Sequence, residues 1–209
     1  MQNLAAIVWL YRGRQERLLG LVKKYLDRVC VESASVPAML APFEATLPGL
    51  RARFDALAKA ADEHSDLDTG KKRALADAVT ELREAHTLYE SDAKKLLASL
   101  SAFGQKYAKE LPEKNDDQHA AHKVFDENAE AMRGLVKQVD LLYKLAARGA
   151  DLGAELATDD TVSAAYDRRT SGRLVKQLDE ERKAAVEQLK HAVYFHRQVA
   201  WLQDRFPKA

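Results

Sequence analysis

The sequence is poor in the residues that disulfides, sheets and turns require. Of its 209 residues one is a cysteine, Cys30, and one is an isoleucine, Ile7, while aromatic residues make up 7%. A single cysteine cannot form an internal disulfide, so a reducing compartment is indicated. Scarce β-branched and aromatic side chains argue against a sheet. With nine glycines and five prolines, chain-breaking residues are few and long helices are expected.

The sequence has no excess of charge of one sign and no long apolar run. The chain has 33 basic and 32 acidic residues and a net charge of +1, which gives no general attraction to nucleic acid or to anionic lipid. The longest wholly apolar run, residues 4–11, is far below the roughly 20 residues that span a bilayer. The first residues lack the basic flank of a secretory signal. We therefore expect a cytoplasmic protein that does not contact a membrane.

What is abundant favours helices. Alanine, leucine, lysine, arginine and glutamate dominate, and these residues lose little side-chain freedom in a helix. The clearest pattern is an unbroken 4-3-4-3 spacing, which is typical of a coiled-coil seam facing a partner helix. It comprises Leu75, Val79, Leu82, His86, Tyr89, Ala93, Leu96, Leu100, Phe103 and Tyr107.

The positions of the prolines, glycines and turn-forming residues then divide the chain into helices. We predict an all-α fold, an elongated antiparallel bundle of about five coiled-coil-like helices in one domain, 1–209. A turn is expected at residues 33–37, and Pro42 and Pro48 should kink or break the helix that follows, because each removes an interior hydrogen bond. The segments that connect the predicted helices are short, and short connections make sequential helices antiparallel neighbours. The predicted helices are 3–30, 36–64, 70–111, 118–156 and 161–206.

Residues that could carry chemistry are few. His119 and His122 are three apart near a helix start and could form a surface metal site, but a merely polar first turn is the stronger interpretation. His86 on the seam is expected to set the helix register. Cys30 has no adjacent histidine and is expected to pack as a small apolar residue. No nucleophile elbow, metalloprotease motif or glycine-rich phosphate loop occurs, so we expect no catalytic residue, bound metal or cofactor in this chain.

Two surfaces are better candidates. Four basic residues lie close together and could contact phosphate, although a solvated face is the alternative. They are Arg168, Arg169, Arg173 and Lys176. Large aromatic residues near the two ends of the chain would make interface anchors if exposed, or would cover the ends of the core if buried. They are Trp9, Tyr11, Tyr194 and Trp201.

Several blocks of the sequence resemble the helical part of modification subunits of type I restriction–modification systems. The first, at residues 3–13 (NLAAIVWLYRG), is similar to a segment that follows the methyltransferase core in that family. The others lie toward the end of the chain. They are residues 137–145 (KQVDLLYKL), 166–169 (YDRR), 174–179 (LVKQLD) and 196–207 (HRQVAWLQDRFP).

The resemblance implies an assembly role. Its family comprises adenine-N6 DNA methyltransferases that use S-adenosylmethionine and work with a specificity subunit and a restriction subunit. The family's catalytic motif, in which an asparagine or aspartate precedes two prolines, is absent, because none of Asn3, Asn115 and Asn128 precedes a proline. The family's glycine-rich cofactor loop is absent as well. The resemblance therefore implies a non-catalytic helical module that contacts the specificity subunit or braces the methyltransferase core, with DNA contacted only through the complex. The alternative is a stand-alone homodimeric coiled-coil scaffold unrelated to DNA.

Overall fold

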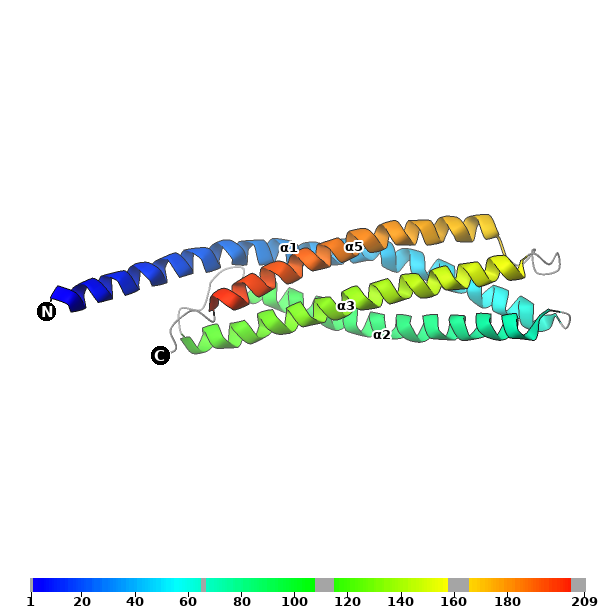
Figure 1. The fold of residues 1–209 in the computed structure, drawn as a ribbon, viewed down its shortest axis with the longest axis horizontal. Helices are drawn as coiled ribbons and strands as arrows, with labels where there is room; N and C mark the ends of the chain where they lie inside the picture. The colour runs from blue at the N-terminus through cyan, green and yellow to red at the C-terminus, as the bar shows by residue number, and fades with distance from the viewer. Residues whose placement is uncertain (1, 65–66, 108–114, 158–165, 204–209) are drawn as a thin grey trace. The chain divides into compact units, whose positions relative to one another are not determined.

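Long helices make up almost all of the computed structural model, which describes residues 2–64, 67–107, 115–157 and 166–203 (Figure 1). The side chains described are those of these residues other than 2–9, 11, 15, 19, 22, 107, 115–122 and 203. Over this part of the chain there are four helices and no strand, so the predicted all-α bundle is confirmed. The helices are α1 (Gln2–Glu63), α2 (Thr69–Tyr107), α3 (Asn115–Leu156) and α5 (Arg168–Gln203).

Helix α1 differs most from the sequence prediction. The turn predicted at residues 33–37 is wrong, because one helix of 62 residues continues through all three prolines. The same continuity rules out a break at Pro42 or Pro48, whereas the kink expected there stays a prediction. A smaller difference concerns α5, which begins at Arg168, whereas Tyr166 and Asp167 just before it are not helical. The helix predicted over 161–206 therefore begins too early in the sequence prediction.

The continuity of α1 follows from a second seam that the sequence contains. Pro37, Pro42 and Pro48 are exposed, while the opposite stripe is buried at a 4-3-4-3 spacing. Three prolines cost of order 9 kcal/mol, whereas seven fully buried apolar side chains contribute roughly 10–20 kcal/mol. The apolar stripe therefore decides the conformation. Its residues are Val36, Leu40, Phe43, Leu47, Leu50, Phe54 and Leu57, each 0–1% exposed.

The seam predicted for α2 is confirmed over the described side chains. All of its members from Leu75 to Phe103 are buried, and Tyr107 lies outside the described side chains. One face of α3 is also buried, with Leu152 half-buried at its end. Its buried members are Phe125, Met132, Leu135, Val139, Leu142 and Leu145.

The chain divides into two compact units. Unit 1 comprises Met1–Val36, Lys95–Arg133 and Gln188–Ala209, and unit 2 comprises Pro37–Lys94 and Gly134–Glu187. The single domain expected from the sequence stays a prediction.

In unit 2 the helices are antiparallel neighbours. Polar side chains bridge successive helices, and in each pair of helices one partner's residue number falls as the other's rises. This is the register of antiparallel packing. The bridges are Glu44–Tyr89 (3.0 Å) and Asp55–Arg83 (2.9 Å) between α1 and α2, Glu81–Arg148 (3.3 Å) and Asp92–Gln138 (2.7 Å) between α2 and α3, and Asp140–Arg182 (2.6 Å) and the Ala154 carbonyl with Arg168 between α3 and α5.

Two glycines of α3, Gly149 and Gly153, allow close packing in unit 2. A Cβ on Gly149 would lie 3.0 Å from the Phe54 ring, and one on Gly153 would lie 2.8 Å from both Leu57 and Tyr166. Tyr166 is buried there, and its hydroxyl donates to the Ala150 carbonyl at 3.2 Å. The short spacing between the helices at this point therefore depends on the absence of two side chains.

Candidate interaction surface

The two C-terminal aromatic residues predicted as interface anchors are exposed in unit 1. Tyr194 and Trp201 are each 53% exposed, and their seven-residue spacing places them on one face of α5. The opposite face of the helix carries the buried His196, Val199 and Leu202. The side chains of Trp9 and Tyr11 lie outside the described residues. Tyr194 and Trp201 therefore form an exposed aromatic stripe on α5.

The apolar core of unit 1 accounts for the inward residues of the same block. Val199, Ala200 and Leu202 pack in one buried cluster with residues of α1, α2 and α3. Phe195, half-buried, lies against this cluster, with the Arg28 guanidinium 5.3 Å from its ring centre. The core thus uses the inner face of residues 196–202, and the aromatic stripe is left on the outer face.

The four basic residues predicted to contact phosphate are exposed at the start of α5, in unit 2. Arg169, Arg173 and Lys176 are spaced i, i+4 and i+7 and share one helical face. Arg168 instead donates to the carbonyl of Ala154, at the end of α3. The neighbouring Asp167 accepts from the Thr170 backbone N–H at 3.0 Å, and its hydrogen bonds with Thr170 lower the pKa of this carboxyl group. Asp167 is thus the N-cap of α5.

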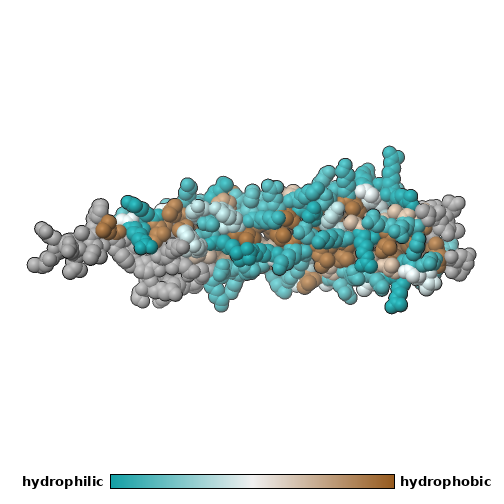
Figure 2. All heavy atoms as spheres, viewed as in Figure 1, coloured by the Kyte–Doolittle hydropathy of each residue, from teal (hydrophilic) through white to brown (hydrophobic). Residues whose placement is uncertain are grey.

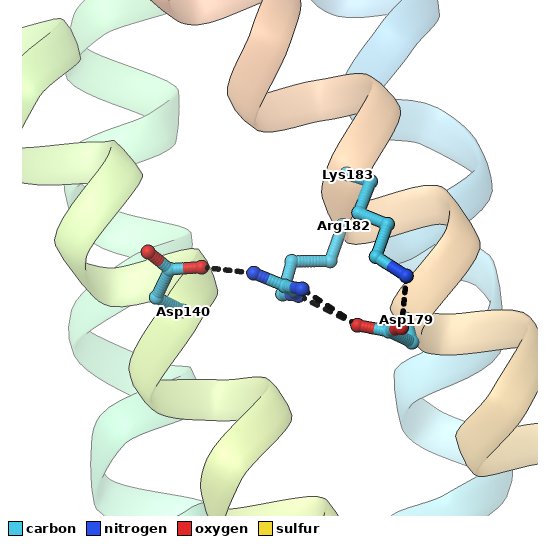
Figure 3. Close-up of polar contacts among 4 residues, drawn as sticks. All are labelled: Asp140, Asp179, Arg182 and Lys183. Atoms are coloured by element: carbon cyan, nitrogen blue, oxygen red, sulfur yellow. Dashed lines mark hydrogen bonds and ion pairs between the residues drawn. The ribbon is translucent and has the colours of Figure 1, made fainter.

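A charged cluster that sequence analysis did not single out joins α3 to α5 in unit 2 (Figure 3). Arg182 binds Asp140 at 2.6 Å and Asp179 at 2.7 Å, and its guanidinium lies 4.8 Å from the Tyr143 ring centre. Lys183 adds a 2.6 Å contact to Asp179. The Lys183 and Arg182 hydrogen bonds lower the pKa of Asp179. The i, i+3 spacing of Asp179 and Arg182 was the available sequence signal, but the contact with Asp140 depends on tertiary packing.

Replacing Arg182 with alanine is expected to destabilise unit 2 by roughly 1–2 kcal/mol. The guanidinium is 22% exposed and joins two carboxylates across a helix interface, so its loss leaves Asp140 and Asp179 without their shared partner. Chemical denaturation followed by circular dichroism measures the effect. Lys183→Ala is the control, because Lys183 is 64% exposed, and a loss as large as that of Arg182→Ala would contradict the assignment.

His86 is buried on the α2 seam, where the sequence predicted a polar residue that sets the register. Its Nδ1 accepts from the Arg51 guanidinium at 2.5 Å, so its Nε2 carries the proton and faces Glu90 at 3.6 Å. Burial lowers the pKa of His86, Glu90 opposes the shift and Arg51 adds to it. A neutral histidine that joins α1 to α2 fits a structural role.

His196 is also buried, and sequence analysis gave it no role. It is 0% exposed in unit 1, with Nε2 2.9 Å from the Ser33 hydroxyl and the rings of Phe103 and Phe125 at 5.5 and 5.6 Å. Its Nδ1 has no hydrogen-bond partner. Burial lowers the pKa of His196 to about 4, because surroundings that exclude water disfavour the charged form of the ring. His191, five residues earlier on the same helix, is exposed, so the sequence alone did not indicate which of the two histidines would be buried.

The remaining candidates for chemistry have structural surroundings or lie outside the described residues. Cys30 is half-buried against the unit 1 core, and burial, together with Asp27, raises the pKa of its thiol, which disfavours the reactive thiolate. The side chains of His119 and His122 lie outside the described residues. Among the side chains that are described, no group of three metal-ligating residues could hold an ion.

Figure 2 shows apolar side chains emerging between hydrophilic ones on the viewed face. In the described parts of the chain, no helix combines the length and apolar character needed to cross a membrane. Comparison with family models, with curated proteins and with solved structures finds no match to this chain.

Proposed function

We propose that this chain is a non-catalytic helical assembly module of a type I restriction–modification methyltransferase subunit, and that it binds the specificity subunit of a cytoplasmic complex. The observation that carries the proposal is the aromatic stripe. Residues 196–207 form one of the blocks that resemble the family; within this block Val199, Ala200 and Leu202 are buried in the core, whereas Trp201 is 53% exposed.

Aromatic residues suit such a contact. Tryptophan and tyrosine dominate the binding energy of many interfaces, because they bury large areas while losing little conformational freedom. On α5, Tyr194 and Trp201 lie about 10 Å apart along the axis, which matches two anchors on one partner helix. The long helices of the described chain offer the extended apolar-and-polar faces that such helix–helix contacts use.

Contact with DNA is proposed only within the assembled complex. Arg169, Arg173 and Lys176 present three charges along one exposed face of α5, and three phosphate contacts would add only modest affinity by themselves. A net charge of +1 for the chain argues in the same direction. The basic face would therefore supplement a DNA contact made by other subunits.

The test is complex formation with the specificity subunit encoded beside the native gene, measured by size exclusion with light scattering and by titration. Wild type is expected to co-elute with it. Tyr194→Ala combined with Trp201→Ala is expected to weaken binding at least about 100-fold, because each anchor contributes roughly 2 kcal/mol or more. Lys23→Ala with Lys24→Ala, two exposed positions of α1 in unit 1, is the control on another helix and should bind as wild type does.

The outcomes separate the alternatives. Separate elution of the wild-type chain contradicts the proposal. A chain that is dimeric by itself, and whose dimer is lost in the Tyr194 and Trp201 variant, favours the homodimeric scaffold unrelated to DNA. Equal losses in the double variant and in the control would show that the stripe is not the contact.

A further inference from the structure

The two units differ in charge, although the whole chain is close to neutral. Unit 1 has 16 basic and 11 acidic residues, whereas unit 2 has 17 basic and 21 acidic residues. The net charge of +1 is therefore the sum of a basic unit and an acidic unit. Much of the excess in unit 1 lies near the start of α1, where residues 10–26 contain one acidic residue, Glu16, and five basic residues. These five are Arg12, Arg14, Arg17, Lys23 and Lys24, all exposed.

The other helices of unit 1 do not offset these five cations. None of the five forms an ion pair with a described side chain. Residues 188–203 of α5 and residues 95–107 of α2 contain no acidic residue. The described acidic side chains of α3 in unit 1 are Asp126, Glu127 and Glu130, and the last two already bind basic residues of α3 and α5. The start of α1 thus stays cationic within its unit.

One edge of α1 in this region has a regular composition. Leu10, Arg14, Arg17 and Leu21 follow a 4-3-4 spacing, so they share one face of the helix. Leu10 is 64% exposed and Leu21 is 44% exposed, and both arginines are exposed as well. Two leucines therefore flank two arginines over about 16 Å of helix. These four residues together form the basic edge of α1.

Further along α1, the same edge contacts α5. Gln188 donates to the Glu32 carboxylate at 2.9 Å, and the Phe195 ring lies against that of Tyr25, with ring centres 6.2 Å apart. Tyr25 and Glu32 continue the 4-3 spacing of the basic edge, so they lie on the same side of α1. This side of the helix is therefore already a helix-binding surface in unit 1.

The basic edge extends past the described end of α5. Between the two contacts with α1, the residue number on α5 rises by seven while that on α1 falls by seven. By this register Gln203, the last residue of α5, lies beside about residue 17 of α1, so Leu10 and Arg14 lie beyond it. Residues 204–209, outside the described chain, contain two basic residues and one acidic residue, so their charge does not complement the edge.

We propose that the basic edge is a docking site for an acidic amphipathic helix of a partner protein, which would lie along α1 in line with α5. Apolar side chains of that helix would pack on Leu10 and Leu21, and its carboxylates would bind Arg14 and Arg17. Guanidinium groups bind carboxylates through paired hydrogen bonds, and the 4-3 spacing is that of helices packed side by side. The edge lies on α1 and does not rest on the proposed contact of the aromatic stripe.

Other occupants fit the basic edge less well. A phosphate backbone offers no apolar group to Leu10 and Leu21, and a helix that lies on a membrane needs a continuous apolar face. A second copy of the chain would present the same arginines on its own edge, where like charges oppose each other. In unit 2 of such a copy, Glu81 and Glu84 lie near the exposed Leu88, but basic residues of α3 offset them.

The test uses the full chain and two labelled helical peptides of about three heptads. Each peptide carries leucines at the spacing of Leu10 and Leu21, with two glutamates between them in one peptide and two lysines in the other. Fluorescence anisotropy is expected to show the glutamate peptide binding at least about tenfold more tightly. Arg14→Glu with Arg17→Glu should reverse that preference, and Leu10→Ser with Leu21→Ser should weaken binding of the glutamate peptide at least about tenfold.

Lys123→Glu with Lys190→Glu is the charge-matched control, since both lysines are exposed in unit 1 on other helices, and it should keep the preference for the glutamate peptide. Circular dichroism and melting temperature establish that each variant is folded. Equal binding of the two peptides, a reversal by the control, or self-association that the arginine variant removes would overturn the proposal. So would binding of a short duplex DNA that the arginine variant abolishes and the leucine variant leaves unchanged.

Discussion

Lowering the pH from 7 to 4.5 is expected to destabilise unit 1 by roughly 2 kcal/mol through His196 alone. In the folded chain the pKa of His196 is about 4, below its ordinary value of 6.5. Between these two pH values the unfolded chain binds a proton that the folded chain does not. Stability therefore falls as the pH falls through this window and stops falling, for this residue, below about pH 4.

Denaturant titrations at pH 7, 5.5 and 4.5 measure the effect. His196→Gln, which is neutral throughout and close in size to histidine, should lose this part of the pH dependence while keeping the part due to the carboxylates. His191→Gln is the control, because His191 is exposed on the same helix, and it should follow wild type. A wild-type pH profile in the His196 variant would contradict the assignment.

Replacing both Gly149 and Gly153 with alanine is expected to destabilise unit 2 by roughly 2–4 kcal/mol. Each new Cβ would lie within 3.0 Å of a side chain of α1 or of Tyr166. Alanine gains about 1 kcal/mol of helix propensity over glycine at each of the two positions, so the overpacking must exceed about 2 kcal/mol for the sign to hold. The Phe54 ring and Tyr166, held by its hydrogen bond to Ala150, have little room to retreat, and the overpacking wins.

Gly134→Ala provides a control of opposite sign in the same helix. A Cβ on Gly134 would meet nothing within 4 Å, so this variant should be stabilised by roughly 0.5–1 kcal/mol. Thermal unfolding of the three proteins makes the comparison. If all of the alanine variants were more stable than wild type, the close approach at Gly149 and Gly153 would not constrain the packing.

The fold was predictable wherever the regular apolar spacing was given more weight than the prolines and glycines. The 4-3-4-3 spacing predicted the α2 seam, and its residues from Leu75 to Phe103 are buried. In α1 the prolines were given more weight than the equally regular spacing from Val36 to Leu57, although its burial outweighs them. The error thus lay in ranking a local rule above a longer apolar pattern.

The candidate surfaces were less predictable, because exposure depends on tertiary packing. The spacing of Tyr194 and Trp201 placed them on one helix face, but whether that face is covered follows from the unit 1 core. Asp140 and Arg182 are 42 residues apart in the sequence, and only the packing of α3 against α5 brings them into contact. His196 was likewise unassigned, since its role comes from Ser33 on another helix.

The three prolines of α1 have a consequence for how the chain folds. Pro37, Pro42 and Pro48 have no amide hydrogen, so the carbonyl groups of Ser33, Ala38 and Glu44, four residues earlier, lack their usual intrahelical donor. This stretch of α1 is a poor helix in isolation and becomes helical through its buried stripe. Because a ribosome delivers α1 before α2, α3 and α5, we expect this stretch to stay unstructured on the nascent chain until the later helices emerge to pack against it.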